Sequence, residues 1–304
     1  MADVLWDNFQ EMTFLKKRIY GLIGLPLKHS FSAAMHNAAF KALKINAEYR
    51  LFEIRPQDVD DFLAQLDKNN INGLNVTIPY KEKVLKFVKL DQESSFLRQV
   101  QAVNTIAKKD GAWTGFNTDI AGFSRHLKEQ FDPVGKKAAI LGAGGAAKAV
   151  AYVLASLKVD SISVFDVDHQ KSSKITDMIK EIFPGFTIYP VDKIEGLEVK
   201  DKDLLVNATP VGLKEEDPCL FKSGQLHSNL FVYDLVYNPA QTKLLALAER
   251  AGARVSNGLG MLLYQGMLSF RIWTGQEAPR QVMEETLNSG LSVKKYNSKK
   301  EKPC

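Results

Sequence analysis

At 304 residues, with 45% hydrophobic content, the chain is long enough to bury a large core and to form about two domains. No apolar run approaches the roughly 18 residues that a membrane-spanning helix needs, and the N-terminal MADVLWDNFQEMTFLKKR carries acidic residues without the cleavage site of a secretory signal. We therefore expect a cytoplasmic protein with no membrane partner.

The formal charge of +5 is concentrated at the C-terminus. From Val293 the sequence VKKYNSKKEKPC holds five Lys and one Glu, a net +4, which leaves +1 for all other residues. A nucleic-acid-binding protein gathers Lys and Arg on one folded face, so this distribution argues against nucleic acid as a partner. We expect residues 293–304 to form a solvated, disordered tail.

Metal and disulfide chemistry has little support in the sequence. Cys219 and Cys304 are the two cysteines, and neither has a Cys or His neighbour at ligand spacing. His29 and His36 lie seven residues apart without an H-E-x-x-H motif. We predict no metal site and interpret the histidines as structural, with His29 as a candidate for the mouth of a site.

The first half of the chain predicts an α/β domain over residues 18–130. Short β-rich runs alternate with amphipathic segments, as in a βαβ parallel sheet: RIYGLIG, then Ser32 to Leu43, AEYRLFEI, Val59 to Asp67 and INGLNV. QAVNTIAKKDGAWTGF reads as two strands joined at an Asp-Gly hairpin turn. In NVTIPYKEK, Thr77 and Pro79 predict the start of a short helix that carries Lys81. A longer helix is expected from Asp119 to about Gln130.

The polar break FDPVGKK marks the expected domain boundary. Beyond it the strand and helix alternation restarts and predicts a doubly wound, Rossmann-like α/β domain over residues 135–258. The apolar GMLLYQGMLSFRIWTG then predicts return helices over residues 259–290 that pack on the first domain. For the segment before Arg18 we expect either a cover for the first domain or a role in self-association.

A glycine-rich turn opens the second domain. AAILGAGGAAKAV places Gly142, Gly144 and Ala147 in a G-x-G-x-x-A pattern between a strand and a helix. Glycine permits the tight turn and lets backbone N–H groups at the helix start approach a pyrophosphate. We therefore predict a dinucleotide site that includes Ala143, Gly145 and Ala146.

Asp166, at the end of the next strand, bears on which dinucleotide binds. A carboxylate there can accept hydrogen bonds from an adenosine ribose diol, as in NAD sites, or can simply hold the local turn. Against a 2′-phosphate about 5 Å away, it would cost on the order of 3 kcal/mol at an effective dielectric near 20. Lys171 and Lys148 could offset part of that repulsion. We predict a preference for NAD over NADP.

Polar side chains gather at strand ends of the first domain, in HSFS, NVTIPYK, AVNT and GFNTDIAGF. Hydroxyls, carboxamides and one lysine with one aspartate suit a small polyhydroxylated acid better than an apolar ligand. Helix capping by Ser32 and Thr77 is the alternative explanation for some of them.

These strings, with GLPLKHSFSAAMHNAAF, QAVNT, LGAGGAAKAV, NATPVGL, YDLVYNP and NGLGMLLYQG, occur in an order and spacing that resemble the shikimate dehydrogenase family, including its quinate/shikimate branch. The resemblance runs from about Tyr20 to Gly275. It implies reversible hydride transfer between a nicotinamide cofactor, NAD or NADP, and C3 of shikimate, which gives 3-dehydroshikimate.

The resemblance also implies roles for individual residues. Lys81 and Asp119 resemble the catalytic pair, with Lys81 acting either as acid and base or by polarising the C3 oxygen. The implied substrate contacts are Ser30, Ser32, Thr77, Asn104, Tyr237 and Gln265. The implied cofactor contacts, beyond the glycine loop, Asp166 and Lys171, are Asn207, Thr209, Leu235 and Gly258.

Two departures from the family pattern stand out. Ala33 replaces a proline that often follows HS-x-S, and Val167 replaces an arginine that NADP-using members place after the second strand. The second departure agrees with the predicted preference for NAD. Three interpretations of the whole chain remain open: a shikimate dehydrogenase, a quinate-preferring dehydrogenase, or a sensor that binds metabolite and cofactor without turnover. Either a monomer or a homodimer is compatible with the sequence.

Overall fold

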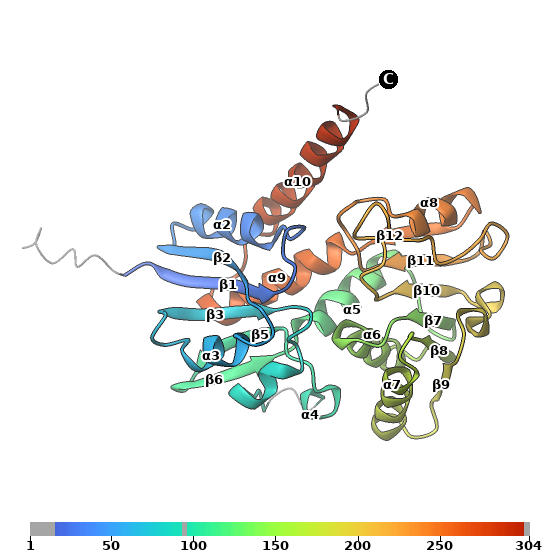
Figure 1. The fold of residues 1–304 in the computed structure, drawn as a ribbon, viewed down its shortest axis with the longest axis horizontal. Helices are drawn as coiled ribbons and strands as arrows, with labels where there is room; N and C mark the ends of the chain where they lie inside the picture. The colour runs from blue at the N-terminus through green and yellow to red at the C-terminus, as the bar shows by residue number, and fades with distance from the viewer. Residues whose placement is uncertain (1–15, 93–95, 301–304) are drawn as a thin grey trace, which may run out of the picture.

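The computed structural model describes residues 16–92 and 96–300 and has two α/β domains (Figure 1). The segment before Arg18, for which we expected a covering or self-association role, lies outside the described residues except for residues 16 and 17. Within the described part of the chain, no helix is both long enough and apolar enough to cross a bilayer.

The first domain is built on a six-stranded sheet in the order β2-β1-β3-β5-β6-β4. Parallel strands form one half: β1 (Arg18–Gly24), β2 (Ala47–Glu53) and β3 (Ile71–Val76). The antiparallel hairpin of β5 (Thr105–Lys109) and β6 (Ala112–Phe116) forms the other half, with short β4 (Lys89–Leu90) at its edge. Asp110 and Gly111 have φ of 53° and 76°, so the predicted hairpin turn is confirmed.

Helices α2 (Ser32–Ala42) and α3 (Val59–Ala64) follow the predicted pattern. The segment around Lys81 differs from the expectation, because residues 78–82 form turns and a 3-10 helix, η1 (Lys83–Phe87), begins only afterwards. Ser32 does not cap α2, the alternative explanation that we considered for its hydroxyl: α2 starts at Ser32, and its cap position has no side-chain hydrogen bond. The short helix α4 (Leu97–Val100) was not predicted.

The second domain contains a fully parallel sheet in the order β12-β11-β10-β7-β8-β9. Its strands are β7 (Lys137–Leu141), β8 (Ser161–Phe165), β9 (Thr187–Val191), β10 (Leu204–Asn207), β11 (Phe231–Asp234) and β12 (Arg254–Asn257). Helices α6 (Gly145–Ser156), α7 (His169–Ile182) and α8 (Lys243–Arg250) cover it. The strand order reverses between β7 and β10, the place where doubly wound sheets bind ligands, so the predicted fold class is confirmed.

Two helices join the domains. Helix α5 (Thr118–Gln130) leaves the first sheet, and α9 (Leu259–Thr274) starts in the second domain and returns to the first (Figure 1). They pack closely, since a Cβ added at Gly122 would lie 2.8 Å from Gln265 Cβ. At its far end, Trp273 donates a hydrogen bond of 3.0 Å to the Ile106 carbonyl. The apolar segment therefore packs on the first domain as the sequence indicates.

Helix α10 (Arg280–Lys300) follows and buries Met283 and Leu287 beside α2. Its backbone is helical as far as Lys300, whereas we expected a disordered tail from Val293. Residues 301–304 lie outside the described residues.

Candidate active site

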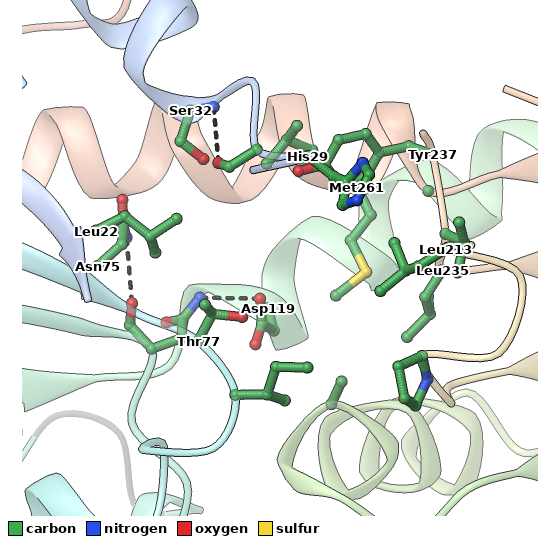
Figure 2. A pocket seen from close by; sticks show the side chains of 18 of the residues that line it. Leu22, His29, Ser32, Asn75, Thr77, Asp119, Leu213, Leu235, Tyr237 and Met261 are labelled. Carbon is green, nitrogen blue, oxygen red and sulfur yellow. Dashed lines mark hydrogen bonds between the residues drawn. The ribbon is translucent and has the colours of Figure 1, made fainter. Parts of the chain in front are cut away.

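A pocket of about 280 Å³ lies between the domains, at the carboxyl ends of strands from both sheets. Figure 2 shows Asn75, Thr77 and Asp119 on the side of the first domain and Leu213 and Leu235 on the side of the second. The predicted residues that line it are Ser30, Ser32, Thr77, Lys81, Asn104, Asp119, Ala146, Thr209, Leu235, Tyr237, Gly258 and Gln265. His29, the candidate for the mouth of a site, lines it as well.

Lys81 and Asp119 form an ion pair inside this pocket. Lys81 Nζ lies 2.5 Å from Asp119 Oδ2, and the two side chains are 11% and 8% exposed. Asp119 is the second residue of α5, where the positive end of the helix dipole favours a carboxylate. The cap residue Asn117 accepts the Ile120 N–H at 3.3 Å, which fixes this first turn. The ammonium group of Lys81 is thus held toward Asp119, in the wall of the pocket.

Asn104 fixes the other oxygen of the aspartate. The Thr118 N–H donates to Asn104 Oδ1 at 2.7 Å, which turns the amide nitrogen toward Asp119. Asn104 Nδ2 then donates to Asp119 Oδ1 at 2.9 Å. Since each carboxylate oxygen has its own donor, the orientation of Asp119 is set by the chain around it.

A cluster of buried hydroxyls lies behind these residues. Ser269, on α9, accepts from Asn75 Nδ2 at 3.0 Å and contacts the hydroxyls of Thr105 and Thr118 at 2.9 Å and 3.2 Å. Asn75 in turn accepts from the Tyr49 hydroxyl at 2.8 Å. Sequence reasoning missed Thr105, Thr118 and Ser269; the four-residue spacing of Gln265 and Ser269, which puts both on one face of α9, was the available signal.

The remaining substrate-side predictions also meet at the pocket. Ser30 Oγ accepts the Ser32 N–H at 3.2 Å, which fixes the Ser30 side chain at the start of α2. Burial raises the pKa of Tyr237, and hydrogen bonds to Ser30 and the Phe31 backbone oppose that rise. Gln265 approaches Thr118 Oγ1 at 3.4 Å. Hydroxyl and amide groups therefore face one side of the cavity.

The glycine loop forms the entrance from the second domain. Gly142 has φ of +93°, a conformation that favours glycine, and a Cβ added at Gly144 would meet no protein atom within 4 Å. Helix α6 has no side-chain cap, so its first N–H groups are free of a capping side chain and point to the space in front of the loop. These features fit a dinucleotide pyrophosphate, which the N–H groups of Gly144, Gly145 and Ala146 would hold, whereas those of Gly142 and Ala143 bond to the Phe165 carbonyl and to Asp166.

Asp166 binds the loop itself. Its Oδ2 accepts the Ala143 N–H at 2.7 Å and its Oδ1 accepts the Asp168 N–H at 2.9 Å. Lys171 lies 3.5 Å from Asp168, and the side chain of Val167 is exposed. Lys148, which we considered as a neutralising charge, pairs instead with Glu82 of the first domain at 2.6 Å. The surroundings of Asp166 are therefore acidic.

Like Asp166, Asn207 is outside the pocket lining, although we predicted both strand-end residues for the cofactor. It is 1% exposed, and its Oδ1 accepts from the Thr209 N–H at 3.1 Å and from Thr209 Oγ1 at 2.7 Å. Thr209 lines the pocket, so Asn207 reaches it through a neighbour. Gly258 packs against the Leu235 backbone, where a Cβ would collide with the carbonyl oxygen.

No cluster of three or more candidate metal ligands occurs among residues 16–92 and 96–300. Cys219 is exposed and free, and Cys304 lies outside the described residues.

Comparison with known proteins identifies the family. The profile described as "Shikimate dehydrogenase substrate binding domain" matches residues 22–106, and "Shikimate 5'-dehydrogenase C-terminal domain" matches residues 258–287. The "Shikimate dehydrogenase (NADP(+))" of Methanopyrus kandleri is 45% identical over 278 residues, which cover 88% of this chain and 94% of that protein.

Two solved structures are similar over nearly their full length. Shikimate 5-dehydrogenase from Listeria monocytogenes, in complex with shikimate and NAD, is 36% identical with a TM-score of 0.77, covering 89% of this chain and 96% of that chain. Quinate dehydrogenase from Corynebacterium glutamicum, in complex with NAD, is 32% identical with a TM-score of 0.79, covering 90% and 99%. This chain belongs to the shikimate dehydrogenase family.

Proposed function

We propose that the protein catalyses the reversible, NAD(P)-dependent oxidation of shikimate to 3-dehydroshikimate. The observation that carries this proposal is the Lys81–Asp119 pair, which lies in one pocket with the hydroxyl and amide side chains of the first domain and with Ala146 of the glycine loop. A polyhydroxylated acid and a dinucleotide can meet only where both sets of groups face the same cavity.

Ser30, Ser32 and Tyr237 bind the substrate carboxylate in this proposal. All three line the pocket, the Ser30 hydroxyl bonds Tyr237, and hydroxyl donors can hold a carboxylate without a neighbouring arginine. Thr77, Asn104 and Gln265 bind the ring hydroxyls, because all three line the pocket with Lys81 and Asp119. Thr77 directly follows β3, Asn104 directly precedes β5, and Gln265 lies on α9.

Oxidation of an alcohol needs a group that receives the hydroxyl proton and another that receives hydride. The bound nicotinamide supplies hydride acceptance and return. Lys81 contacts the reacting oxygen, either exchanging its proton or polarising it, and Asp119 fixes the direction of the lysine. The low exposure of both side chains keeps water from the reacting centre.

For the cofactor we propose NAD as the preferred partner of this chain. Asp166 and Asp168 would face a 2′-phosphate, and Lys171 already pairs with Asp168. The relative from Methanopyrus kandleri is named for NADP(+), whereas the Listeria monocytogenes enzyme was crystallised with NAD. A tenfold or greater advantage of NADP in kcat/KM, about 1.4 kcal/mol, would overturn this preference.

Quinate is the second candidate substrate, because a quinate dehydrogenase shares the fold at 32% identity. Quinate and shikimate both offer a carboxylate and ring hydroxyls to the same side chains. Steady-state kcat/KM for each acid with each cofactor tests both proposals together. We expect shikimate with NAD to give the highest value. Tight binding of acid and cofactor without turnover would instead support the sensor interpretation.

A further inference from the structure

Asp234 is a fully buried carboxylate at the end of β11, and the pocket chemistry does not use it directly. Its Oδ1 accepts from Asn207 Nδ2 at 2.9 Å and from the Val236 N–H at 3.0 Å. Its Oδ2 accepts from Thr242 Oγ1 at 2.7 Å. One side chain thus ties three segments that follow β10 and β11.

The first of these segments, residues 207–211, depends on Asp234 through Asn207. The Asn207 amide nitrogen donates to Asp234 and, at 3.1 Å, to the Val211 carbonyl, and its oxygen receives both donors of Thr209. Because Asp234 can only accept, it fixes the direction of that amide. The turn that places Thr209 in the pocket is therefore built on the carboxylate.

The second segment, residues 235–237, begins directly after Asp234. The bond to the Val236 N–H folds the chain back over the carboxylate, and Leu235, Val236 and Tyr237 all line the pocket. Thr209 and these three residues are hereafter called the second-domain wall. The hydrogen bonds that Asn207 Nδ2 and the Val236 N–H donate to Asp234 Oδ1 hold both loops of this wall in place.

Stability alone gives no reason for a charge at this position. Burial is the largest influence on this carboxyl and raises its pKa to about 6, against the opposing hydrogen bonds from Thr242, Val236 and Asn207. The raised pKa reflects the cost of burying a charge whose direct partners are neutral. A buried carboxylate costs free energy that its hydrogen bonds offset only in part, whereas an apolar side chain would avoid the cost but could not bond to the two loops.

We propose that Asp234 is a positioning residue that holds the second-domain wall in the shape that receives the nicotinamide end of the cofactor. This inference rests on the proposed dehydrogenase function, since it assigns a purpose to the wall of that same pocket. It predicts that losing the carboxylate weakens the cofactor more than the acid substrate. Ser30, Ser32 and Thr77 belong to the first domain, and Tyr237, the one substrate contact in the wall, is also held by its hydrogen bonds to Ser30 and the Phe31 backbone.

Variants Asp234→Ala and Asp234→Asn of the full chain test the inference. Asparagine keeps an acceptor for Asn207 and Val236 and can donate to Thr242, whereas alanine removes every bond. We expect the Kd for NADH, measured by fluorescence titration, to rise at least about tenfold in Asp234→Ala. The KM of the same variant for shikimate should rise less than about threefold. In Asp234→Asn, the Kd for NADH should also rise less than about threefold.

Thr176→Val is a matched control, because Thr176 is a buried hydroxyl of α7 in the same domain that is absent from the pocket lining. It should leave the Kd for NADH unchanged. If Asp234→Ala does not fold, Asn207→Ala replaces it, since that change frees only the 207–211 turn. Wild-type affinity for NADH in a folded Asp234→Ala or Asn207→Ala protein would overturn the inference. Absence of turnover in the wild type would overturn the proposed function instead, and the titration would still report on Asp234.

Discussion

Gly145, in the first turn of the cofactor-loop helix α6, faces the side chain of Lys81. A Cβ added at Gly145 would lie 3.1 Å from Lys81 Cδ and 3.2 Å from Lys81 Cβ, which is closer than most such contacts. The two domains therefore contact each other at Lys81. Besides letting a pyrophosphate approach, the glycine loop leaves room for the side chain of Lys81.

This contact predicts that alanine substitutions at two neighbouring glycines change different quantities, kcat for one and the Kd for NADH for the other. Gly145→Ala should press on Lys81 and lower kcat, by about tenfold, with little change in the Kd for NADH. Gly144→Ala places a methyl group in the open space before the loop, so it should raise the Kd for NADH and leave kcat at saturating cofactor nearly unchanged. Steady-state kinetics with the two variants checks this, and an identical pattern in both would contradict it.

The Lys81–Asp119 pair predicts a loss of catalysis with the fold intact. Lys81→Ala should lower kcat by about a thousandfold, at the middle of the range for removal of a proton-transfer group. Asp119→Asn should lower kcat less, because the amide oxygen can still accept from Lys81 while the charge is lost. A Lys81→Ala variant that changed only KM for shikimate would assign the lysine to binding alone.

The buried hydroxyl cluster predicts an indirect effect on the same reaction. Ser269→Ala removes one buried hydrogen-bond partner from each of Asn75, Thr105 and Thr118, so these side chains lose bonds that water cannot replace. We expect a loss of about 1–3 kcal/mol in the free energy of unfolding and a rise in the KM for shikimate. Thr274→Val is the control and should leave KM unchanged, because Thr274 is on the same helix but its hydroxyl bonds the Phe270 carbonyl and the Gln276 N–H rather than the buried cluster.

His36 predicts a pH dependence of stability. Its ring is completely buried, stacks on Tyr49 at 4.5 Å, and has no hydrogen-bond partner among the described residues. Burial lowers its pKa to about 3, below the unfolded value of 6.5, so protons bind the unfolded chain first and stability is lost as pH falls below 6.5.

The contribution of His36 to the pH dependence of stability can be measured by comparison with His36→Phe, which keeps an aromatic ring in the stack. Between pH 7 and pH 5, the wild type should lose about 2 kcal/mol more unfolding free energy than the variant. The comparison cancels Asp234, whose raised pKa acts in the opposite direction over the same pH range. Urea unfolding at both pH values provides the measurement, and equal losses in the two proteins would refute it.

Local patterns of the sequence predicted most of the fold. Alternation of strands and helices, the Asp-Gly hairpin and the glycine turn each depend on neighbouring residues, and they appear as β5–β6 and β7–α6 in the structure. The turn around Lys81 was mistaken for a helix because Thr77 and Pro79 are compatible with both. Tertiary hydrogen bonds of the segment, such as the Thr77 N–H to the Ile23 carbonyl, decide between them.

The parts of the site that sequence reasoning missed depend on long-range contacts. Asn75 and Ser269 are separated by 194 positions, and no local pattern indicates that they share a hydrogen bond. Asn207 was assigned to the cofactor from its motif, whereas the structure places its side chain on Asp234 and Thr209. Chemistry at the surface of the pocket could be predicted, but the buried residues that orient it could not.

Helix α9 has a mechanical consequence for domain motion. Met261 and Gln265 are one turn apart on this helix, about 6 Å along its axis, and both line the pocket. A rigid helix cannot change that separation. The contacts that a relative movement of the domains would alter are instead those between separate elements, such as Glu82 with Lys148 and Lys81 with Gly145. The position of Lys81 in the cavity therefore depends on how closely the two domains approach each other.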